Sequence, residues 1–111
     1  MPTLDLQTLT CIKETAQVGK DKIYIDVNGG TVWGPKEMGK KDTEPVDVQL
    51  SFDTNAMITL YEKDSLSKDD YLGTKSICGV QTVSADFTGS QTLDFNQNGA
   101  YYQLSIQVSR S

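Results

Sequence analysis

The sequence contains no histidine, the side chain that proteins use most often as a general base and as a metal ligand. It has only two cysteines, so a standard zinc site cannot be assembled from cysteine and histidine. Phosphate-binding glycine loops and the Gly-x-Ser-x-Gly motif are also missing. Catalysis would have to use carboxylates, lysines and hydroxyls, which form no recognisable catalytic unit. The sequence therefore predicts a protein that is not an enzyme.

Long apolar runs are missing as well. No apolar stretch approaches the roughly 20 residues of a membrane-spanning helix, so no transmembrane segment is expected. The N-terminus, MPTLDLQTLTCIKE, lacks the basic and then apolar plan of a signal peptide. We therefore expect a cytoplasmic location, with a peripheral membrane location as the alternative. In a reducing compartment Cys11 and Cys78 are expected to be free thiols, and a single disulfide is the alternative.

Positive charge is scarce. Ten basic residues stand against fifteen acidic ones, and the net charge is −5. A nucleic-acid-binding protein normally needs a basic face, so nucleic acid is not an expected partner. Adsorption to an anionic membrane by charge alone is disfavoured for the same reason. With 111 residues, of which 37% are hydrophobic, the chain fits one packed domain covering residues 1–111.

Apolar residues recur with a period of two along most of the chain. In VDVQLSF (46–52) every second residue is apolar, and IYIDV (23–27) and YQLSIQVS (102–109) follow the same pattern. Strands with one buried and one solvated face alternate in this way and form antiparallel sheets. The sequence therefore predicts an all-β fold, an antiparallel β-sandwich of eight strands. The strands are expected near residues 6–13, 23–27, 31–33, 46–52, 57–62, 72–77, 91–95 and 101–108.

Residues suited to tight turns separate several of these strands, with NGG at 28–30, DTN at 53–55 and NQNG at 96–99. The longer connections before residue 78 follow the first, third and fifth strands. Because successive antiparallel strands alternate in direction, these connections should emerge at one end of the sandwich. Loops are where such folds keep their binding sites. The three predicted loops are residues 14–22, 34–45 and 63–71.

One of these loops lies within an acidic stretch, YEKDSLSKDDYLG (61–73). Carboxylates two residues apart on an extended segment project to the same side, so Glu62 and Asp64 can face one cation together. Asp70 returns after the loop, and the backbone carbonyl of Lys63 offers another oxygen. Calcium accepts six to eight oxygen ligands in irregular geometry. No EF-hand spacing occurs, so a calcium ion would have to bind between loops.

This stretch resembles the third calcium-binding loop of C2 domains, the calcium-dependent phospholipid-binding modules. In that family an acid-x-Asp pair ends a strand, another Asp follows six residues later, and a hydrophobic residue and Gly open the next strand. Here Glu62, Asp64, Asp70 and Leu72-Gly73 take those positions. Upstream, GKDKIYIDV (19–27) resembles the first loop of the family, with Asp21 at the ligand position and Tyr24 at the aromatic one.

The resemblance implies an eight-stranded Greek-key sandwich of the second C2 topology, because all three loops connect odd to even strands. It also implies that the acidic end binds calcium and then docks on anionic phospholipid or on a protein partner. In a membrane-docking member, the apolar residues Val18, Met38 and Leu66 at the loop tips would insert between lipid headgroups. The expected metal ligands are Asp21, Glu62, Lys63, Asp64, Asp70 and Glu14.

The sequence departs from the family pattern in ways that weaken the predicted site. Thr15 stands where the family usually has an Asp, although the adjacent Glu14 could substitute with a register change. Glu62 replaces an Asp, and its extra methylene moves the carboxylate outward. These changes predict a dissociation constant of about 10⁻⁴ to 10⁻³ M.

An alternative leaves calcium out, because Asp, Ser and Lys are also typical of solvated turns. On this interpretation the chain is a calcium-independent interaction or structural module. Asp69 is expected to point to solvent beside Asp70, and only its position in a loop favours Asp42 as a ligand. Trp33 and Tyr61 are expected to pack in the core or on a sheet face rather than to stack on a ligand.

Overall fold

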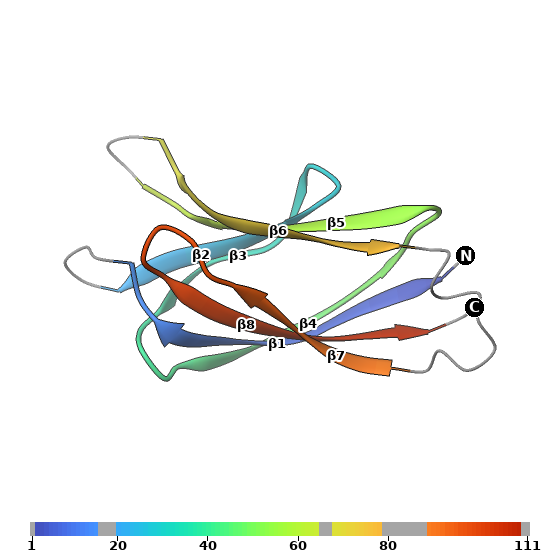
Figure 1. Ribbon diagram of the computed structural model, residues 1–111, viewed down its shortest axis with the longest axis horizontal. Coiled ribbons are helices and arrows are strands. Elements are labelled where there is room, and N and C mark those ends of the chain that lie inside the picture. Colours follow the sequence, from blue (N-terminus) through green and yellow to red (C-terminus); the bar gives the residue numbers. More distant parts are fainter. Residues whose placement is uncertain (1, 16–19, 65–67, 79–88, 110–111) are drawn as a thin grey trace.

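The computed structural model describes residues 2–15, 20–64, 68–78 and 89–109, and within them the chain forms two β-sheets packed face to face (Figure 1). All eight predicted strands are present. Their bounds are β1 Thr3–Lys13, β2 Asp21–Val27, β3 Gly30–Met38, β4 Thr43–Ser51, β5 Asn55–Glu62, β6 Asp70–Cys78, β7 Gly89–Phe95 and β8 Tyr101–Ser109.

The two sheets have the strand orders β4-β1-β8-β7 and β3-β2-β5-β6. Every neighbouring pair of strands is antiparallel. Strands far apart in the sequence, such as β1 and β8, lie side by side, as a Greek-key arrangement requires. This is the eight-stranded antiparallel sandwich that the alternating pattern predicts.

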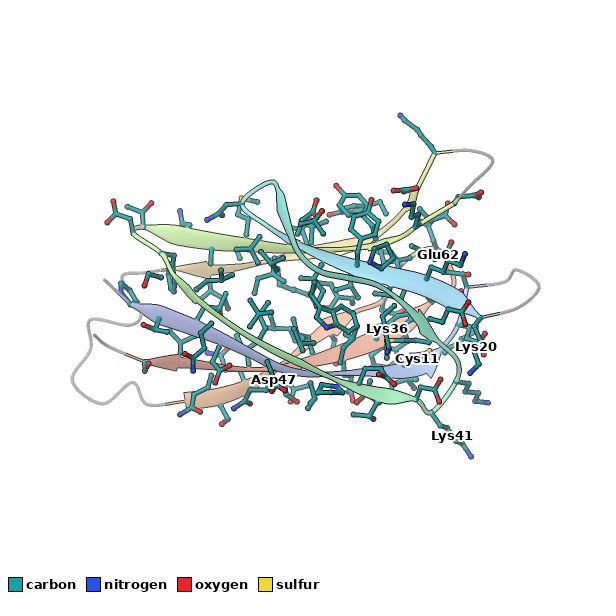
Figure 2. All side chains as sticks on the ribbon, turned by 180° about the vertical axis from the view of Figure 1, so that it is seen from behind. Cys11, Lys20, Lys36, Lys41, Asp47 and Glu62 are labelled. Carbon is teal, nitrogen blue, oxygen red and sulfur yellow. The ribbon has the colours of Figure 1, made fainter. Side chains whose placement is uncertain are left out.

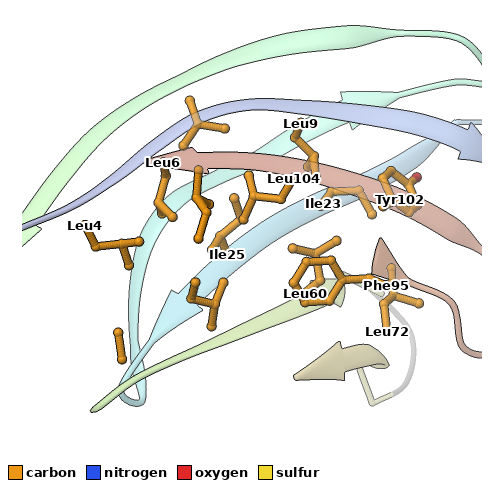
Figure 3. Close-up of a cluster of buried hydrophobic side chains, with 14 of the residues drawn as sticks. Leu4, Leu6, Leu9, Ile23, Ile25, Leu60, Leu72, Phe95, Tyr102 and Leu104 are labelled. Atoms are coloured by element: carbon orange, nitrogen blue, oxygen red, sulfur yellow. The ribbon is translucent and has the colours of Figure 1, made fainter. Parts of the chain in front are cut away.

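The core lies between the sheets and consists of the apolar side chains that point inward from the strands (Figure 3). The alternation is clearest in β8, where every second residue from Tyr102 to Val108 is buried. Burying one face of each sheet removes a large apolar area from water, which is the main stabilising term for such a fold. The largest fully buried side chains are those of Tyr102, Phe95, Leu4, Leu6, Leu9, Ile23, Ile25, Met38, Ile58, Leu60, Leu72 and Leu104.

The tight turns form as predicted. Asn28 and Gly29 make a two-residue connection between β2 and β3, with φ angles of 52° and 87°. Positive φ at both central residues matches the right-handed twist of the flanking strands, and asparagine and glycine adopt it at low cost.

The predicted loop over 34–45 is wrong. Strand β3 continues to Met38 and β4 begins at Thr43, so only residues 39–42 connect them. Gly34 and Pro35, which lie within the predicted loop, instead occupy a shift in the β2–β3 register between Ile23 and Ile25. A proline is tolerated there because β3 is an edge strand, whose outer N–H groups have no strand partner.

Met38 is also placed differently from the prediction. It is the last residue of β3, and its side chain is fully buried in the core instead of lying at a loop tip. The other two predicted loop-tip residues, Val18 and Leu66, lie outside the described residues.

Candidate functional site

The connections β1–β2, β3–β4 and β5–β6 meet at one end of the sandwich, as predicted (Figure 1). We call this end the loop pole and define it by the described connection residues 14–15, 20, 39–42, 63–64 and 68–69. Hydrogen bonds join the β3–β4 connection to β1 and to the β1–β2 connection. The Cys11 N–H donates to the Asp42 carbonyl at 2.9 Å, and the Lys40 N–H donates to Glu14 Oε1 at 2.9 Å. Figure 2 shows Cys11, Lys20, Lys41 and Glu62 toward this end.

Asp21 lies beneath the loop pole and is completely buried. The Thr15 hydroxyl donates to Asp21 Oδ1 at 2.6 Å, and the Thr15 N–H donates to Asp21 Oδ2 at 3.0 Å. The Tyr102 hydroxyl donates to the same Oδ2 atom at 2.6 Å. Because Asp21 belongs to β2 and Tyr102 to β8, this carboxylate connects the two sheets. Buried carboxylates are costly unless donors satisfy them, and these three donors do so.

The surroundings of Asp21 shift the acidity of its neighbours. Burial raises the pKa of Tyr102, and the hydrogen bond to Asp21 raises it further. Burial likewise raises the pKa of the Cys11 thiol, which is also hydrogen-bonded to Tyr102. Cys11 is a buried free thiol, and the side chain of Cys78 lies outside the described residues.

The β5–β6 hairpin carries three more of the predicted acidic ligands, Glu62, Asp64 and Asp70. Glu62 ends β5 with its side chain only 2% exposed, and its Cα partner across the ladder is Asp70. The Asp64 N–H donates to Asp69 Oδ1 at 3.0 Å, and the Tyr24 hydroxyl donates to Asp69 Oδ2. These two donors lower the pKa of Asp69.

The expectation that Asp69 points away to solvent is therefore wrong. Asp69 is half-buried and holds the two arms of the hairpin together, while also binding Tyr24 of β2. Asp side chains commonly accept bonds from backbone N–H groups across a turn. The neighbouring tyrosine could not be foreseen, because the β2–β5 register sets its position.

The predicted ligands do not form a calcium shell in the described part of the chain. No three or more of its acidic and cysteine side chains are grouped closely enough to hold a metal ion. Asp21 is engaged by Thr15 and Tyr102, and Glu14 accepts the Lys40 N–H. Asp42, the ligand favoured by position alone, accepts the Gly39 N–H at 2.8 Å and lies 3.8 Å from Lys20 Nζ. Calcium takes six to eight oxygen ligands, and the described side chains alone bring no such set together.

A tyrosine cluster covers the outer face of the sheet β3-β2-β5-β6. Tyr24 and Tyr61 are cross-strand partners with ring centroids 5.2 Å apart, and Tyr61 and Tyr71 are partners with centroids 5.9 Å apart. Tyr61 thus packs on a sheet face, as predicted. The sequence analysis missed this cluster, because it placed Tyr71 in the predicted loop 63–71 and because the register between strands decides which tyrosines are neighbours.

A shallow pocket of about 210 Å³ opens beside this cluster. Aromatic, charged and hydroxyl side chains line it, and Lys63 is the positively charged residue among them. Lys63, which was predicted as a carbonyl ligand, thus lines this pocket, while its backbone N–H donates to the Lys22 carbonyl at 2.8 Å. The lining residues are Tyr24, Thr31, Pro35, Lys63 and Asp69.

This sandwich, with three connections at one pole, has the C2-like fold. A solved C2 domain matches it with a TM-score of 0.63 and 10% sequence identity, covering 99% of this chain and 100% of that one. The paired C2 domains of extended synaptotagmin 2 match with a TM-score of 0.63 and 14% identity, covering 97% of this chain and 39% of that one. Their calcium-bound structure matches with a TM-score of 0.60 and 15% identity, over 97% and 44% of the two chains.

These similarities are similarities of fold. No family model matches the sequence, and no curated protein matches it. The described part of the chain also contains no helix long and apolar enough to cross a membrane.

Proposed function

We propose that this chain is a protein-interaction module that docks without calcium. The observation that supports this proposal is the state of Asp21, which is buried and accepts hydrogen bonds from Thr15 and Tyr102. Calcium binding through Asp21 would compete with these three hydrogen bonds in the interior, one of which joins the two sheets. Hydrogen-bond donors of the chain itself therefore satisfy the Asp21 carboxylate, which the resemblance to C2 domains assigns to a metal ion.

The tyrosine cluster is the docking surface in this proposal. Tyr71 is 40% exposed, and Met57, further along the same face of β5, is 50% exposed. Tyrosine and methionine are enriched at protein–protein interfaces, where they contribute large contact areas at low entropic cost. An anionic membrane is a poorer partner, because a net charge of −5 opposes adsorption in the absence of calcium.

Affinity capture in a calcium chelator tests the proposal. Wild-type protein should retain a partner that Tyr71→Ala loses, because the exposed ring is removed from the centre of the contact. Tyr101→Ala is the matched control, since Tyr101 lies on β8 in the opposite sheet and its loss should leave capture unchanged. Equal retention by both variants would show that the partner docks elsewhere. Flotation with phosphatidylserine vesicles in chelator should show no binding, and binding there would favour a membrane instead.

Calcium binding at the loop pole is a second candidate function. It is favoured by the register of the β5–β6 hairpin, where Glu62 and Asp70 are cross-strand partners and Asp64 follows on the same arm. In this candidate the hairpin carboxylates and the Lys63 carbonyl would take a calcium ion without Asp21 or Glu14. Bound calcium would offset the local negative charge and allow docking on anionic phospholipid. Calcium-dependent flotation of vesicles, abolished by Asp64→Asn, is the result this candidate requires.

A further inference from the structure

The four edge strands of the sandwich differ in how they are protected against pairing with another chain. Strands β3 and β4 form one side, and both carry devices that discourage strand addition. Pro35 lies at a register shift in β3, and Pro45 lies beside the shift at which Asp47 of β4 has a φ of 52°. Lys36 Nζ and Glu44 Oε1, 3.6 Å apart, bridge the two edges.

On the other side, the described residues protect the edge of β6 in this way but not the edge of β7. The register of β6 shifts near Gly73, and the Asn98 side chain donates to the Tyr71 carbonyl at 2.5 Å. Strand β7 pairs with β8 over all seven residues from Gly89 to Phe95 without a shift. Its sequence, GSQTLDF, has no proline and a single charge. A groove of about 200 Å³ lies between β6 and the end of β7.

We propose that β7 pairs in antiparallel fashion with β7 of a second copy of this chain, about a two-fold axis that passes between the two Thr92 residues. An edge strand presents unpaired N–H and C=O groups along its outer side, and a continuous, regular edge is the best template for another strand. Centring on Thr92 lets the whole of β7 take part, because Thr92 is the middle residue of Gly89–Phe95. The two β7 strands would join their four-stranded sheets into one.

The charges of β7 suit this pairing. In the two-fold register, Ser90 of one copy lies opposite Asp94 of the other, and Thr92 lies opposite Thr92. The two Asp94 carboxylates therefore do not face each other. Within its own chain, Asp94 Oδ1 already accepts hydrogen bonds from the Tyr101 hydroxyl and Gln103 Nε2, both at 3.1 Å. Cross-strand threonine pairs are favourable, whereas like charges directly opposite each other are not.

Sedimentation equilibrium over a range of concentrations tests the proposal with two matched substitutions. Thr92 and Ser90 are both exposed and point to the same face of β7. Thr92→Lys places two lysines opposite each other and should raise the dimer dissociation constant at least about tenfold. High salt should partly reverse that loss, because it screens the repulsion. Ser90→Lys adds the same charge but faces Asp94 of the other copy, so the dimer should persist or tighten.

A wild type that stays monomeric up to about 1 mM would overturn the proposal, as would equal effects of the two substitutions. Hydrogen exchange of the wild type provides a second test that needs no variant. Amides of β7 should exchange more slowly as the protein concentration rises, while those of β4 at the opposite edge should not change. A dimer whose formation leaves β7 exchange unaltered would place the interface elsewhere.

Discussion

At the residue scale, Asp21 brings a carboxylate into the interior of the sandwich, where Thr15 and Tyr102 donate three hydrogen bonds to it. Such a group stabilises the fold only while its donors remain in place. Removing one donor leaves part of the desolvation cost of the carboxylate uncompensated. The hydroxyl of Tyr102 is the donor that can be removed with the smallest change of shape.

Tyr102→Phe should therefore lower the free energy of unfolding by about 2 kcal/mol. For a domain of this size that loss corresponds to a fall in Tm of about 10 °C. Tyr101→Phe provides the control, because the Tyr101 hydroxyl binds Asp94 on the exposed face, and its loss should cost less than about 0.5 kcal/mol. Urea unfolding of both variants measures the difference, and equal losses would contradict the role assigned to the buried hydroxyl.

The same contacts predict how the tyrosines titrate. Burial raises the pKa values of Tyr24 and Tyr102, and hydrogen bonds to Asp69 and Asp21 raise them further. Above the ordinary tyrosine pKa of about 10, the unfolded chain releases these protons and the folded chain keeps them, so stability should fall as the pH rises. Ultraviolet difference spectra should show hydroxyls that ionise only on unfolding. In Tyr102→Phe the late-ionising signal should shrink, and an unchanged signal would contradict this assignment.

The sequence identified Asp21 as a candidate site residue, but it could not identify its donors. Tyr102 lies 81 positions away, and its contact with Asp21 depends on how the two sheets stack. Thr15 was noted as a missing acid, although its hydroxyl and N–H both bind Asp21. A local motif can indicate which polar side chain lies near a loop. The hydrogen-bond donors of that side chain can come from distant parts of the chain, and only the fold brings them together.

At the element scale, the alternation of apolar residues predicted all eight strands. A strand that buries one face has an apolar residue at every second position, so its own sequence shows the pattern. The length of β3 could not be predicted in the same way. Gly34 and Pro35 usually interrupt a strand, and only the position of β3 at a sheet edge makes them acceptable. Whether a strand lies at the edge or in the centre of a sheet depends on the strand order, which the local sequence does not determine.

A substitution at Gly34 tests whether the register shift in β3 requires a glycine. Gly34 has a φ of +86°, and a Cβ added there would lie 2.4 Å from the Ile23 carbonyl oxygen, which is backbone and cannot move aside. Gly34→Ala should destabilise the protein by about 3 kcal/mol or more. Gly29 has a similar φ of +87° with no atom near an added Cβ, so Gly29→Ala should cost only about 1 kcal/mol. Thermal unfolding measures the stability of both variants. Similar losses of stability would contradict this prediction, because they would show that the backbone around Gly34 can accommodate a Cβ.

At the scale of the whole molecule, the C2-like sandwich gathers three connections at one pole and a tyrosine cluster on one face. The fold alone does not decide whether such a pole uses calcium. That depends on whether the carboxylates near the pole are available to a cation. Because Asp21 is held by Thr15 and Tyr102, we infer that the module recognises its partner without the ion.

Thermal unfolding with and without millimolar calcium tests this inference most directly. Ligand at ten times its dissociation constant stabilises a folded protein by roughly 1.4 kcal/mol, a rise in Tm of several degrees for a domain of this size. Calcium-independent docking predicts the same Tm in calcium and in chelator, for the wild type and for Asp64→Asn alike. A rise of several degrees in the wild type that Asp64→Asn abolishes would contradict it and establish calcium binding by the β5–β6 hairpin.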